Sequence, residues 1–209
     1  MSILINHRFI TFEGIDGCGK STQARMLLDY LEQSGEQVFF VREPGGTPIS
    51  EAVRGILLDI NRAELSDRTE ALLMTASRAQ LTDELIIPAL EAGQWVIADR
   101  YADSTLAYQG SGRGIDMEWL IRLNKFATAD LEPGVTFVID VNPALGQQRR
   151  SAVNDRIEEA GLSFQAKVRD GYREIAERFP ERIIVLDGSA SITVIHKQVI
   201  KEMTRRKLI

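Results

Sequence analysis

The sequence predicts an α/β fold in which five parallel strands form one sheet between two layers of helices. Three observations support this. Short apolar runs of the β type alternate with longer segments of helical periodicity. Glycines stand where elements are expected to end, and a glycine-rich loop joins the first apolar run to the first helical segment. Strands separated by helices form parallel sheets, and ligands then bind at the carboxyl ends of the strands.

Five short runs rich in β-branched or aromatic residues predict the strands. In chain order they are Phe9–Glu13, Gln37–Val41, Trp95–Asp99, Val135–Val141 and Arg182–Leu186. Six longer segments with apolar residues at helical spacing predict the helices. They are Ser21–Ser34, Ile49–Asp59, Arg68–Ala92, Met117–Thr128, Ser163–Phe179 and Ser191–Arg205. Because proline lacks an N–H group, Pro88 predicts a kink or a break late in the longest helix.

Length and composition predict a single domain with a closing segment. The chain has 209 residues, of which 44% are hydrophobic and 26% charged, as in an ordinary globular protein. We expect residues 1–209 to form one domain. Within it, residues 142–161 are polar, rich in Arg and Glu and poor in core residues, which is typical of a lid over a binding site. A solvated surface helix is the alternative for this segment.

Charge and cysteine content narrow the class of protein. The formal net charge of −5 argues against a nucleic-acid partner but is compatible with small phosphorylated ligands. The single cysteine, Cys18, excludes an internal disulfide and suits a reducing compartment. No apolar stretch reaches transmembrane length, and the N-terminus lacks the pattern of a signal peptide. We therefore expect a cytoplasmic protein with no membrane partner.

A phosphate-binding loop lies between the first predicted strand and the first predicted helix. Residues 13–22 read Glu-Gly-Ile-Asp-Gly-Cys-Gly-Lys-Ser-Thr, which matches the P-loop pattern G-x4-G-K-S/T. Glycines let the backbone aim N–H groups at phosphate oxygens, Lys20 can reach the β- and γ-phosphates, and the Ser21 hydroxyl can bind Mg²⁺. The pattern predicts a P-loop NTPase-type fold that binds a nucleoside triphosphate. The predicted contact residues are Gly14, Ile15, Asp16, Gly17, Cys18, Gly19, Lys20, Ser21 and Thr22.

Asp16 is unusual because it places an anion in a loop whose other groups hold anions. We expect it to contact something other than the phosphates, such as a sugar hydroxyl or a metal, or else to be solvated.

Two further strands are followed by charged residues that we expect beside this loop. Asp99 ends the third run, where a carboxylate can bind Mg²⁺ or a water of its shell. Arg42 follows the second run and begins the sequence Arg-Glu-Pro-Gly-Gly-Thr. A guanidinium there suits a phosphate or an anchoring contact in the turn, with a surface salt bridge as the alternative.

Two features predict a binding region for a second substrate. The segment Tyr108–Gly114 is rich in glycine but follows a helical stretch, so it predicts a mobile loop that carries substrate-binding side chains rather than a dinucleotide site. Arg78 stands between small residues in the long helix and can reach inward, with a surface arginine as the alternative.

Three arginines, Arg149, Arg150 and Arg156, cluster in the lid segment. Phosphoryl transfer leaves charge on the equatorial oxygens, and guanidinium groups that arrive on closure can stabilise it. A solvated charged face is the alternative.

Four motifs taken together resemble the bacterial thymidylate kinases. They are Glu13-Gly14-x-Asp16-Gly17-x-Gly19-Lys20-Ser21-Thr22, Arg42-Glu43-Pro44-Gly45-Gly46-Thr47, Asp99-Arg100-Tyr101-x2-Ser104-x2-Ala107-Tyr108-Gln109-Gly110 and Asp155-Arg156-Ile157-Glu158. The resemblance runs from residue 9 to about residue 175. It implies a P-loop nucleoside monophosphate kinase that transfers the γ-phosphoryl group of ATP to thymidine 5′-monophosphate (dTMP), giving ADP and dTDP, with Mg²⁺.

By position, the resemblance also implies roles for residues of the acceptor site. Arg100 grips the acceptor phosphate, and Asp16 lies near the 3′-hydroxyl of the acceptor sugar and the metal shell. Arg78 hydrogen-bonds the thymine edge, and Met74 stands where the family has a phenylalanine that stacks on thymine. Arg42 is included among the substrate-binding residues. The other residues implied for the nucleoside pocket are Thr105, Tyr108, Gln109 and Tyr172.

The family has two branches that differ in the source of the catalytic arginine. Gly17 occupies the position of the loop arginine, so this chain resembles the branch whose arginine comes from the lid, here Arg149 or Arg150. The implied catalytic residues are Asp16, Lys20, Arg100, Arg149 and Arg150. Members of the family are usually homodimers, which implies an interface on the apolar face of the long helix.

Two other readings of the sequence remain. One is a kinase of the same fold that acts on another deoxynucleotide or on a deoxynucleoside. The other is a non-catalytic nucleotide switch of the GTPase type, which would need an Asn-Lys-x-Asp motif. The nearest match, residues 124–127, reads Asn-Lys-Phe-Ala and lacks the acid.

Overall fold

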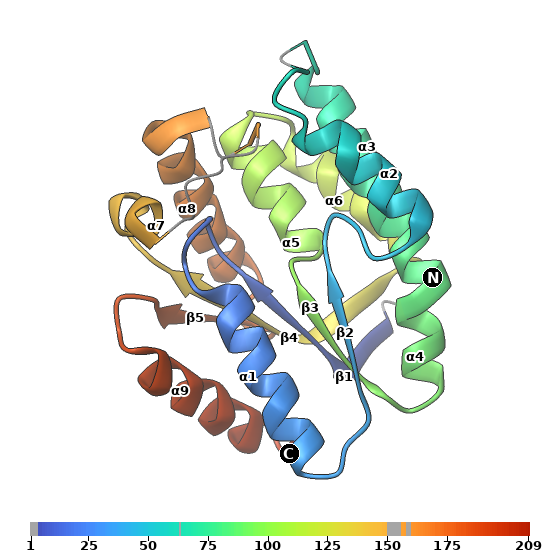
Figure 1. Ribbon diagram of the computed structural model, residues 1–209, viewed down its shortest axis with the longest axis vertical. Coiled ribbons are helices and arrows are strands. Elements are labelled where there is room, and N and C mark those ends of the chain that lie inside the picture. The colour runs from blue at the N-terminus through green and yellow to red at the C-terminus, as the bar shows by residue number, and fades with distance from the viewer. Residues whose placement is uncertain (1–3, 63, 150–155, 158–159) are drawn as a thin grey trace.

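The computed structural model describes residues 4–62, 64–149, 156–157 and 160–209. Five strands form one sheet in the order β2-β3-β1-β4-β5, and all four strand pairs are parallel (Figure 1). The strands are β1 (Leu4–Glu13), β2 (Val38–Arg42), β3 (Trp95–Asp99), β4 (Leu131–Asp140) and β5 (Ile183–Asp187). The predicted α/β fold with a five-stranded parallel sheet is confirmed.

The central strands β1 and β4 begin earlier than predicted. Their first residues pair Leu4 with Leu131, and the register then shifts between Asn6 and Ile10. Polar residues at this shift interrupt the apolar run, so the sequence carries no continuous strand signal there.

The helices cover both faces of the sheet. They are α1 (Lys20–Gln33), α2 (Pro48–Leu58), α3 (Asp67–Leu81), α4 (Ile87–Glu91), α5 (Ala102–Thr105), α6 (Met117–Ala127), α7 (Pro143–Arg149), α8 (Gly161–Arg178) and α9 (Ile192–Arg205). Helices α1 and α9 pack together on one face, and α3, α5, α6 and α8 group on the other (Figure 1). None of the described helices is long and apolar enough to cross a membrane.

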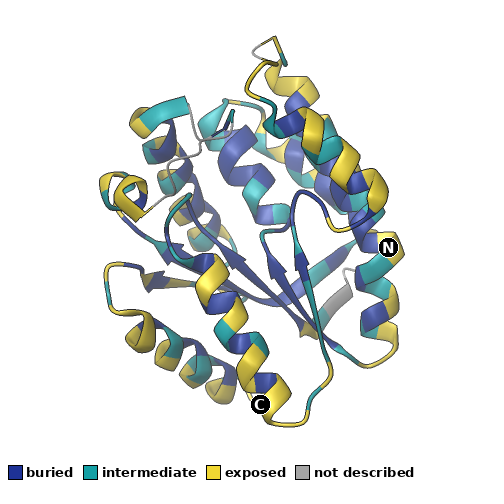
Figure 2. Ribbon diagram, viewed as in Figure 1, coloured by how far each residue is buried: buried dark blue, intermediate teal, exposed yellow. Residues whose placement is uncertain are grey.

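Because side chains alternate along a strand, neighbouring residues of β1 pack in different buried clusters. Ile10 and Phe12 of β1 share a buried cluster with Leu27 of α1, whereas Phe9 shares another with Leu81 of α3. Strand β3 and residues Phe9–Glu13 of β1 are buried, while exposed residues follow the outer faces of α1, α2 and α9 (Figure 2). The sheet is thus a rigid support whose carboxyl edge is available for a site.

The predicted long helix Arg68–Ala92 is divided. A π-helical segment, η1 (Thr82–Ile86), separates α3 from α4, and Pro88 is the second residue of α4. Because Pro88 cannot donate a backbone hydrogen bond, the helical pattern changes in the turn before it. The predicted break near Pro88 is confirmed.

The prediction of a mobile loop at Tyr108–Gly114 is wrong. Helix α5 continues directly into a second π-helical segment, η2 (Leu106–Gly112), whose residues from Leu106 to Gly110 are buried. The glycines serve close packing here, because a Cβ on Gly112 would lie 2.7 Å from the ring of Phe164 in α8.

Candidate active site

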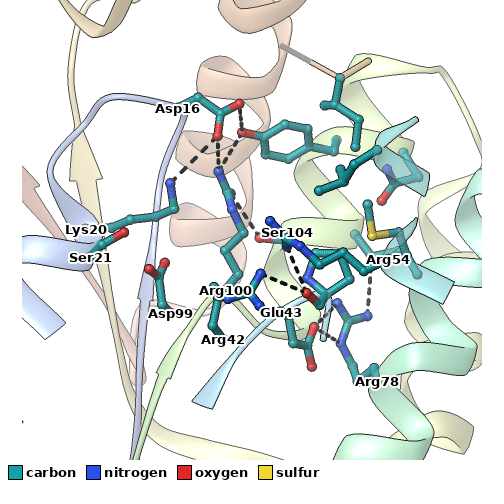
Figure 3. Close-up of a pocket in the computed structure, with 17 residues that line it drawn as sticks. Asp16, Lys20, Ser21, Arg42, Glu43, Arg54, Arg78, Asp99, Arg100 and Ser104 are labelled. Atoms are coloured by element: carbon teal, nitrogen blue, oxygen red, sulfur yellow. Dashed lines mark hydrogen bonds and ion pairs between the residues drawn. The ribbon is translucent and has the colours of Figure 1, made fainter. Parts of the chain in front are cut away.

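A cavity of ≈ 200 Å³ lies at the carboxyl ends of the central strands (Figure 3). The register brings these ends to one level, since Asp99 of β3 pairs with Phe12 of β1 and Arg42 of β2. The cavity therefore lies where a parallel sheet places ligands. Its lining residues are Asp16, Lys20, Ser21, Arg42, Glu43, Pro44, Arg54, Leu58, Met74, Arg78, Asp99, Arg100, Ser104, Thr105, Tyr108, Gln109 and Ile157.

One end of the cavity is formed by the phosphate loop and the start of α1. Lys20, Ser21 and Asp99 lie together at this end (Figure 3). Helix α1 begins after Gly19, whose φ is 98°, and no side chain of the described residues caps it. The N–H groups of its first turn are therefore available to an anion, as the sequence pattern predicts.

The other residues of the loop contribute backbone rather than side chains. Ile15 and Cys18 are 2% and 1% exposed and point into the core. Burial raises the pKa of the Cys18 thiol, which favours its neutral form. Gly14 lies so close to β4 that a Cβ would be 2.6 Å from a backbone carbonyl oxygen. Gly17 has a φ of 77°, and Thr22 is exposed.

Asp16 is held by protein groups on several sides. Its carboxylate lies 2.5 Å from Arg100 Nη2 and 3.8 Å from Lys20 Nζ. The Tyr108 hydroxyl donates to it at 3.0 Å and Gln165 Nε2 at 3.2 Å. Burial acts to raise the pKa of Asp16, but Arg100 and Lys20 prevail and lower it to about 2. Asp16 is thus a charged, buried carboxylate, and its role toward the acceptor sugar stays a prediction.

Arg100 lies between the two ends of the cavity (Figure 3). Besides Asp16, its Nη2 donates to the Tyr108 hydroxyl at 3.0 Å, and its Nη1 donates to the Gly14 carbonyl oxygen at 3.0 Å. Its backbone φ of 76° lies in the left-handed region, which is uncommon for a residue with a side chain. Burial disfavours the charged guanidinium, but Tyr108 and Asp16 raise the pKa of Arg100 well above its ordinary value.

The residues predicted to hold Mg²⁺ fit that cation. Asp99 is 6% exposed, and its Oδ1 has no hydrogen-bond partner among the described residues. A buried carboxylate oxygen that lacks a partner suits a hard cation or one of its waters, and the Ser21 hydroxyl at the same end can supply a second oxygen.

Arg78 is enclosed at the opposite end of the cavity, with 1% of its surface exposed. It points inward, as predicted. Its Nε and Nη2 donate to Glu43 Oε2 at 2.9 and 2.6 Å, and Nη2 also donates to the Tyr101 carbonyl oxygen at 2.9 Å. Its Nη1 donates to Thr105 Oγ1 and Asn124 Oδ1, both at 2.8 Å. These contacts occupy the five N–H groups of a guanidinium, so a hydrogen bond to thymine would replace one of them.

Arg42 anchors the turn after β2. Its Nη1 donates to the Pro44 carbonyl oxygen at 3.3 Å and its Nη2 to Glu51 Oε1 at 3.0 Å. The next residue, Glu43, is buried, and burial raises its pKa to about 7 although Arg78 acts to lower it. Of the contacts considered for Arg42, the structure shows both the anchoring contact in the turn and the surface salt bridge, here with Glu51, whereas a contact with a phosphate stays a prediction.

The residues implied for the nucleoside pocket divide into two groups. Met74, Thr105, Tyr108 and Gln109 line the cavity. Tyr172 is not among the described residues that line it. Its hydroxyl lies 3.3 Å from Arg100 Nη1 and donates to Glu13 Oε2 at 2.7 Å. Tyr172 therefore contacts Arg100, which lines the pocket, and Glu13, which lies beside it.

The described lid arginines lie outside the cavity lining. Arg149, at the end of α7, donates to the Gly188 carbonyl oxygen at 2.8 Å. Arg156 donates to Glu70 Oε2 at 2.5 Å, which ties it to α3 rather than to a phosphate position. Arg150 lies outside the described residues, as do residues 151–155 and 158–159 of the predicted lid. That Arg149 or Arg150 is the catalytic arginine therefore stays a prediction.

Sequence reasoning assigned no role to several residues that line the cavity. They are Glu43, Pro44, Arg54, Leu58, Ser104 and Ile157. Arg54 donates to the Pro44 carbonyl oxygen at 2.9 Å. Its signal in the sequence is weak: it stands four residues after Ser50, which is buried, and so shares the inner face of α2.

Comparisons with known proteins agree with this geometry. The family model described as Thymidylate kinase matches residues 12–199. The thymidylate kinase of Kosmotoga olearia is 48% identical over 196 residues, which cover 93% of this chain and 94% of that protein. The thymidylate kinase of Citrifermentans bemidjiense is 45% identical over 192 residues, covering 88% and 85%. The crystal structure of thymidylate kinase from Ehrlichia chaffeensis matches with a TM-score of 0.77 and 38% identity, covering 93% of this chain and 97% of that one.

Motifs, fold and cavity thus lead to one conclusion, which the family match and the relatives share. The chain belongs to the thymidylate kinase family, the nucleoside monophosphate kinases that phosphorylate dTMP with ATP to give dTDP.

Proposed function

We propose that the cavity carries out this reaction with the ATP phosphates at the Lys20 end, dTMP at the Arg78 end, and Arg100 between them. The observation that supports this division most directly is the position of Arg100 in a single cavity that has a cationic group at each end (Figure 3). A kinase must bring the donor and acceptor phosphates into line, and Lys20 at the first and Arg100 at the second serve that purpose.

At the donor end, the free N–H groups of α1 and the Lys20 ammonium bind the β- and γ-phosphates. Ser21 and Asp99 hold Mg²⁺, which neutralises phosphate charge when it is bound. The lid supplies a further guanidinium, from Arg149 or Arg150, to the transferred group. Arg149 would leave its contact with Gly188 to do so.

At the acceptor end, Arg100 binds the phosphate of dTMP. Asp16 then faces the 3′-hydroxyl of the sugar and stays next to Tyr108, whose ring crowds the 2′ position and favours deoxyribose. The base packs on Met74, since a thioether makes favourable contacts with a ring. Thr105, Gln109 and Arg78 surround its polar edge.

We also propose that the protein is a cytoplasmic homodimer. Apolar side chains are exposed on three helices that lie next to one another: Ile49 and Ile56 of α2, Leu72 of α3 and Phe126 of α6. Single exposed apolar residues are common, but a group of them on adjacent helices is typical of a protein interface.

A substrate panel tests the proposed reaction. With ATP and Mg²⁺ in a coupled ADP assay, dTMP is expected to give a much higher kcat/KM than the monophosphates of deoxycytidine and deoxyguanosine. Lys20→Ala, which removes the donor-site ammonium, controls for activity from contaminating kinases and should abolish the signal with every acceptor. Comparable rates for the three acceptors would instead favour the kinase of broader or different specificity.

A further inference from the structure

Glu13 is a buried carboxylate next to the site that does not line the cavity. It is the last residue of β1, directly before the phosphate loop, and 0% of its surface is exposed. Four groups donate to it: the Tyr101 and Ser104 N–H groups to Oε1 at 2.7 and 3.2 Å, and the Ser104 and Tyr172 hydroxyls to Oε2 at 2.6 and 2.7 Å.

The first two contacts fix the backbone on which Arg100 stands. Tyr101 and Ser104 lie at the start of α5, so Glu13, the last residue of strand β1, caps the N-terminus of this helix. The N–H of Arg100 itself donates to the Phe12 carbonyl oxygen at 3.0 Å. Two consecutive residues of β1 therefore hold two consecutive N–H groups, one on each side of the left-handed φ of 76° at Arg100. Such a conformation is unfavourable for a residue with a side chain and persists only where neighbouring contacts enforce it.

The other two contacts fix the direction of the guanidinium. The Ser104 and Tyr172 hydroxyls each lie 3.3 Å from Arg100 Nη1. Because a guanidinium only donates, both hydroxyl oxygens accept from Arg100, and their protons are directed to Glu13. Arg100 Nη1 is thereby held by the Glu13 network, and Nη2 is left to face Asp16 and the cavity.

We propose that Glu13 is a positioning residue that directs the Arg100 guanidinium at the acceptor phosphate. It acts through two routes, the capped backbone of α5 and the hydroxyls of Ser104 and Tyr172. The inference rests on the proposed role of Arg100 in binding dTMP.

Glu13→Gln tests the first element of this network. An amide has one acceptor oxygen in place of two, so it cannot serve both the N–H pair and the hydroxyl pair. The KM for dTMP is expected to rise at least about tenfold, as when one hydrogen bond to a charged group is lost. The KM for ATP should change much less than the KM for dTMP, because the donor phosphates are bound by Lys20 and the N–H groups of α1, none of which hydrogen-bonds Glu13 among the described residues.

Tyr172→Phe tests the second route and keeps the test valid if Glu13→Gln does not fold. The ring remains and only the hydroxyl is lost, so a residue that merely lines a pocket would show an unchanged KM for dTMP. A positioning role predicts a higher KM for dTMP with an unchanged KM for ATP.

A matched control separates positioning from loss of stability. Asp103 is a buried carboxylate of the same helix, but it pairs with Arg182 at 2.6 Å instead of contacting the Arg100 network. Asp103→Asn should lower the melting temperature and leave the KM for dTMP unchanged. A rise in KM equal to that of Glu13→Gln would overturn the proposal.

The double variant Glu13→Gln/Arg100→Ala decides whether Glu13 acts through Arg100. Arg100→Ala alone should raise the KM for dTMP, and Glu13→Gln should add nothing further in that background. Additive effects would refute the positioning role. If Arg100→Ala itself left the KM unchanged, the proposed function of Arg100 would fail, and this result is distinct from the failure of Glu13.

Discussion

At the scale of single residues, the ion pair of Glu43 and Arg78 links the cavity to pH. Their side chains are 4% and 2% exposed and lie 2.6 Å apart. Burial raises the pKa of Glu43 from 4.5 to about 7, although Arg78 opposes this shift. Between these two values the folded protein holds a proton that the unfolded chain has already released. Stability therefore falls as the pH rises from 4.5 to about 7.

Glu43→Gln should remove this dependence. The variant cannot titrate, so its free energy of unfolding should vary less between pH 4.5 and about 7 than that of the wild type. Because the amide of Gln resembles the protonated Glu43, the stability of the variant should come closest to that of the wild type near pH 4.5, where the wild-type carboxyl is also neutral. Chemical denaturation at a series of pH values measures both effects. Glu91→Gln, the same change at an exposed position of α4, should keep the wild-type slope, and an unchanged slope in Glu43→Gln would contradict the assignment.

Residue by residue, the sequence predicts the groups that follow a strand or stand in a dense motif. Asp99 and Arg100 could be predicted because they end an apolar run beside the phosphate loop. Arg54 could not, since one arginine on a helix carries no local sign of the cavity it faces. Glu13 stood in a quoted motif, but its contacts come from residues about 90 and 160 positions away, which no local pattern connects.

At the scale of elements, close packing of α8 on η2 supports the acceptor side of the site. A Cβ on Gly171 of α8 would lie 2.4 Å from Ser111 Oγ and 3.3 Å from the Cα of Ala107. The same η2 segment carries Tyr108 and Gln109 into the cavity. The distance between α8 and η2 is therefore set by the absence of a side chain at residue 171.

Gly171→Ala should destabilise the protein by about 1–3 kcal/mol, the usual cost of overpacking a tight contact. Gly55→Ala is the matched control, because a Cβ at this α2 position meets nothing within 4 Å. It should raise stability by up to about 1 kcal/mol through helix propensity and a less flexible unfolded chain. Urea unfolding of the two variants compares them directly, and equal effects would contradict the packing argument.

Helices and strands whose apolar residues follow a clear pattern in the sequence could be predicted, and elements without such a pattern could not. Each of the five predicted apolar runs overlaps a strand, although β1 and β4 begin earlier, because buried parallel strands read as apolar runs. The π-helical segments have no such signal, since their wider turns depend on tertiary contacts rather than on a 3.6-residue period. The glycines of Tyr108–Gly114 indicated a loop, whereas in the structure two of them, Gly110 and Gly112, make room for side chains of α6 and α8.

At the scale of the whole molecule, the site and the exposed apolar surface lie on the same set of helices. Helices α2 and α3 supply Leu58, Met74 and Arg78 to the cavity on one side. The surface of α2 and α3 also carries exposed residues (Figure 2). One of them is Leu72, which is 50% exposed. A dimer interface on this exposed surface of α2 and α3 would hold in place the two helices that line the acceptor end of the cavity.

Leu72→Glu should weaken the proposed homodimer, because a charge would be buried against an apolar partner surface. Sedimentation equilibrium over a range of protein concentrations should show a wild-type dimer and a variant shifted toward the monomer. Ile192→Glu on α9 is the control, since this residue is 57% exposed but lies across the sheet. A monomeric wild type, or equal loss of dimer in both variants, would contradict the proposed interface.

The contact between Asp16 and Arg100 affects how the affinity for dTMP depends on the salt concentration. Before any nucleotide enters, the carboxylate already neutralises Arg100 and lies 3.8 Å from Lys20. An incoming phosphate therefore exchanges with an anion that belongs to the protein, and few ions from solution have to be displaced. Lysine and arginine side chains without a carboxylate partner would attract anions from solution, and their affinity for a phosphate would fall as the salt concentration rises. With its own counter-ion in place, the cavity should bind dTMP with an affinity that changes little with ionic strength.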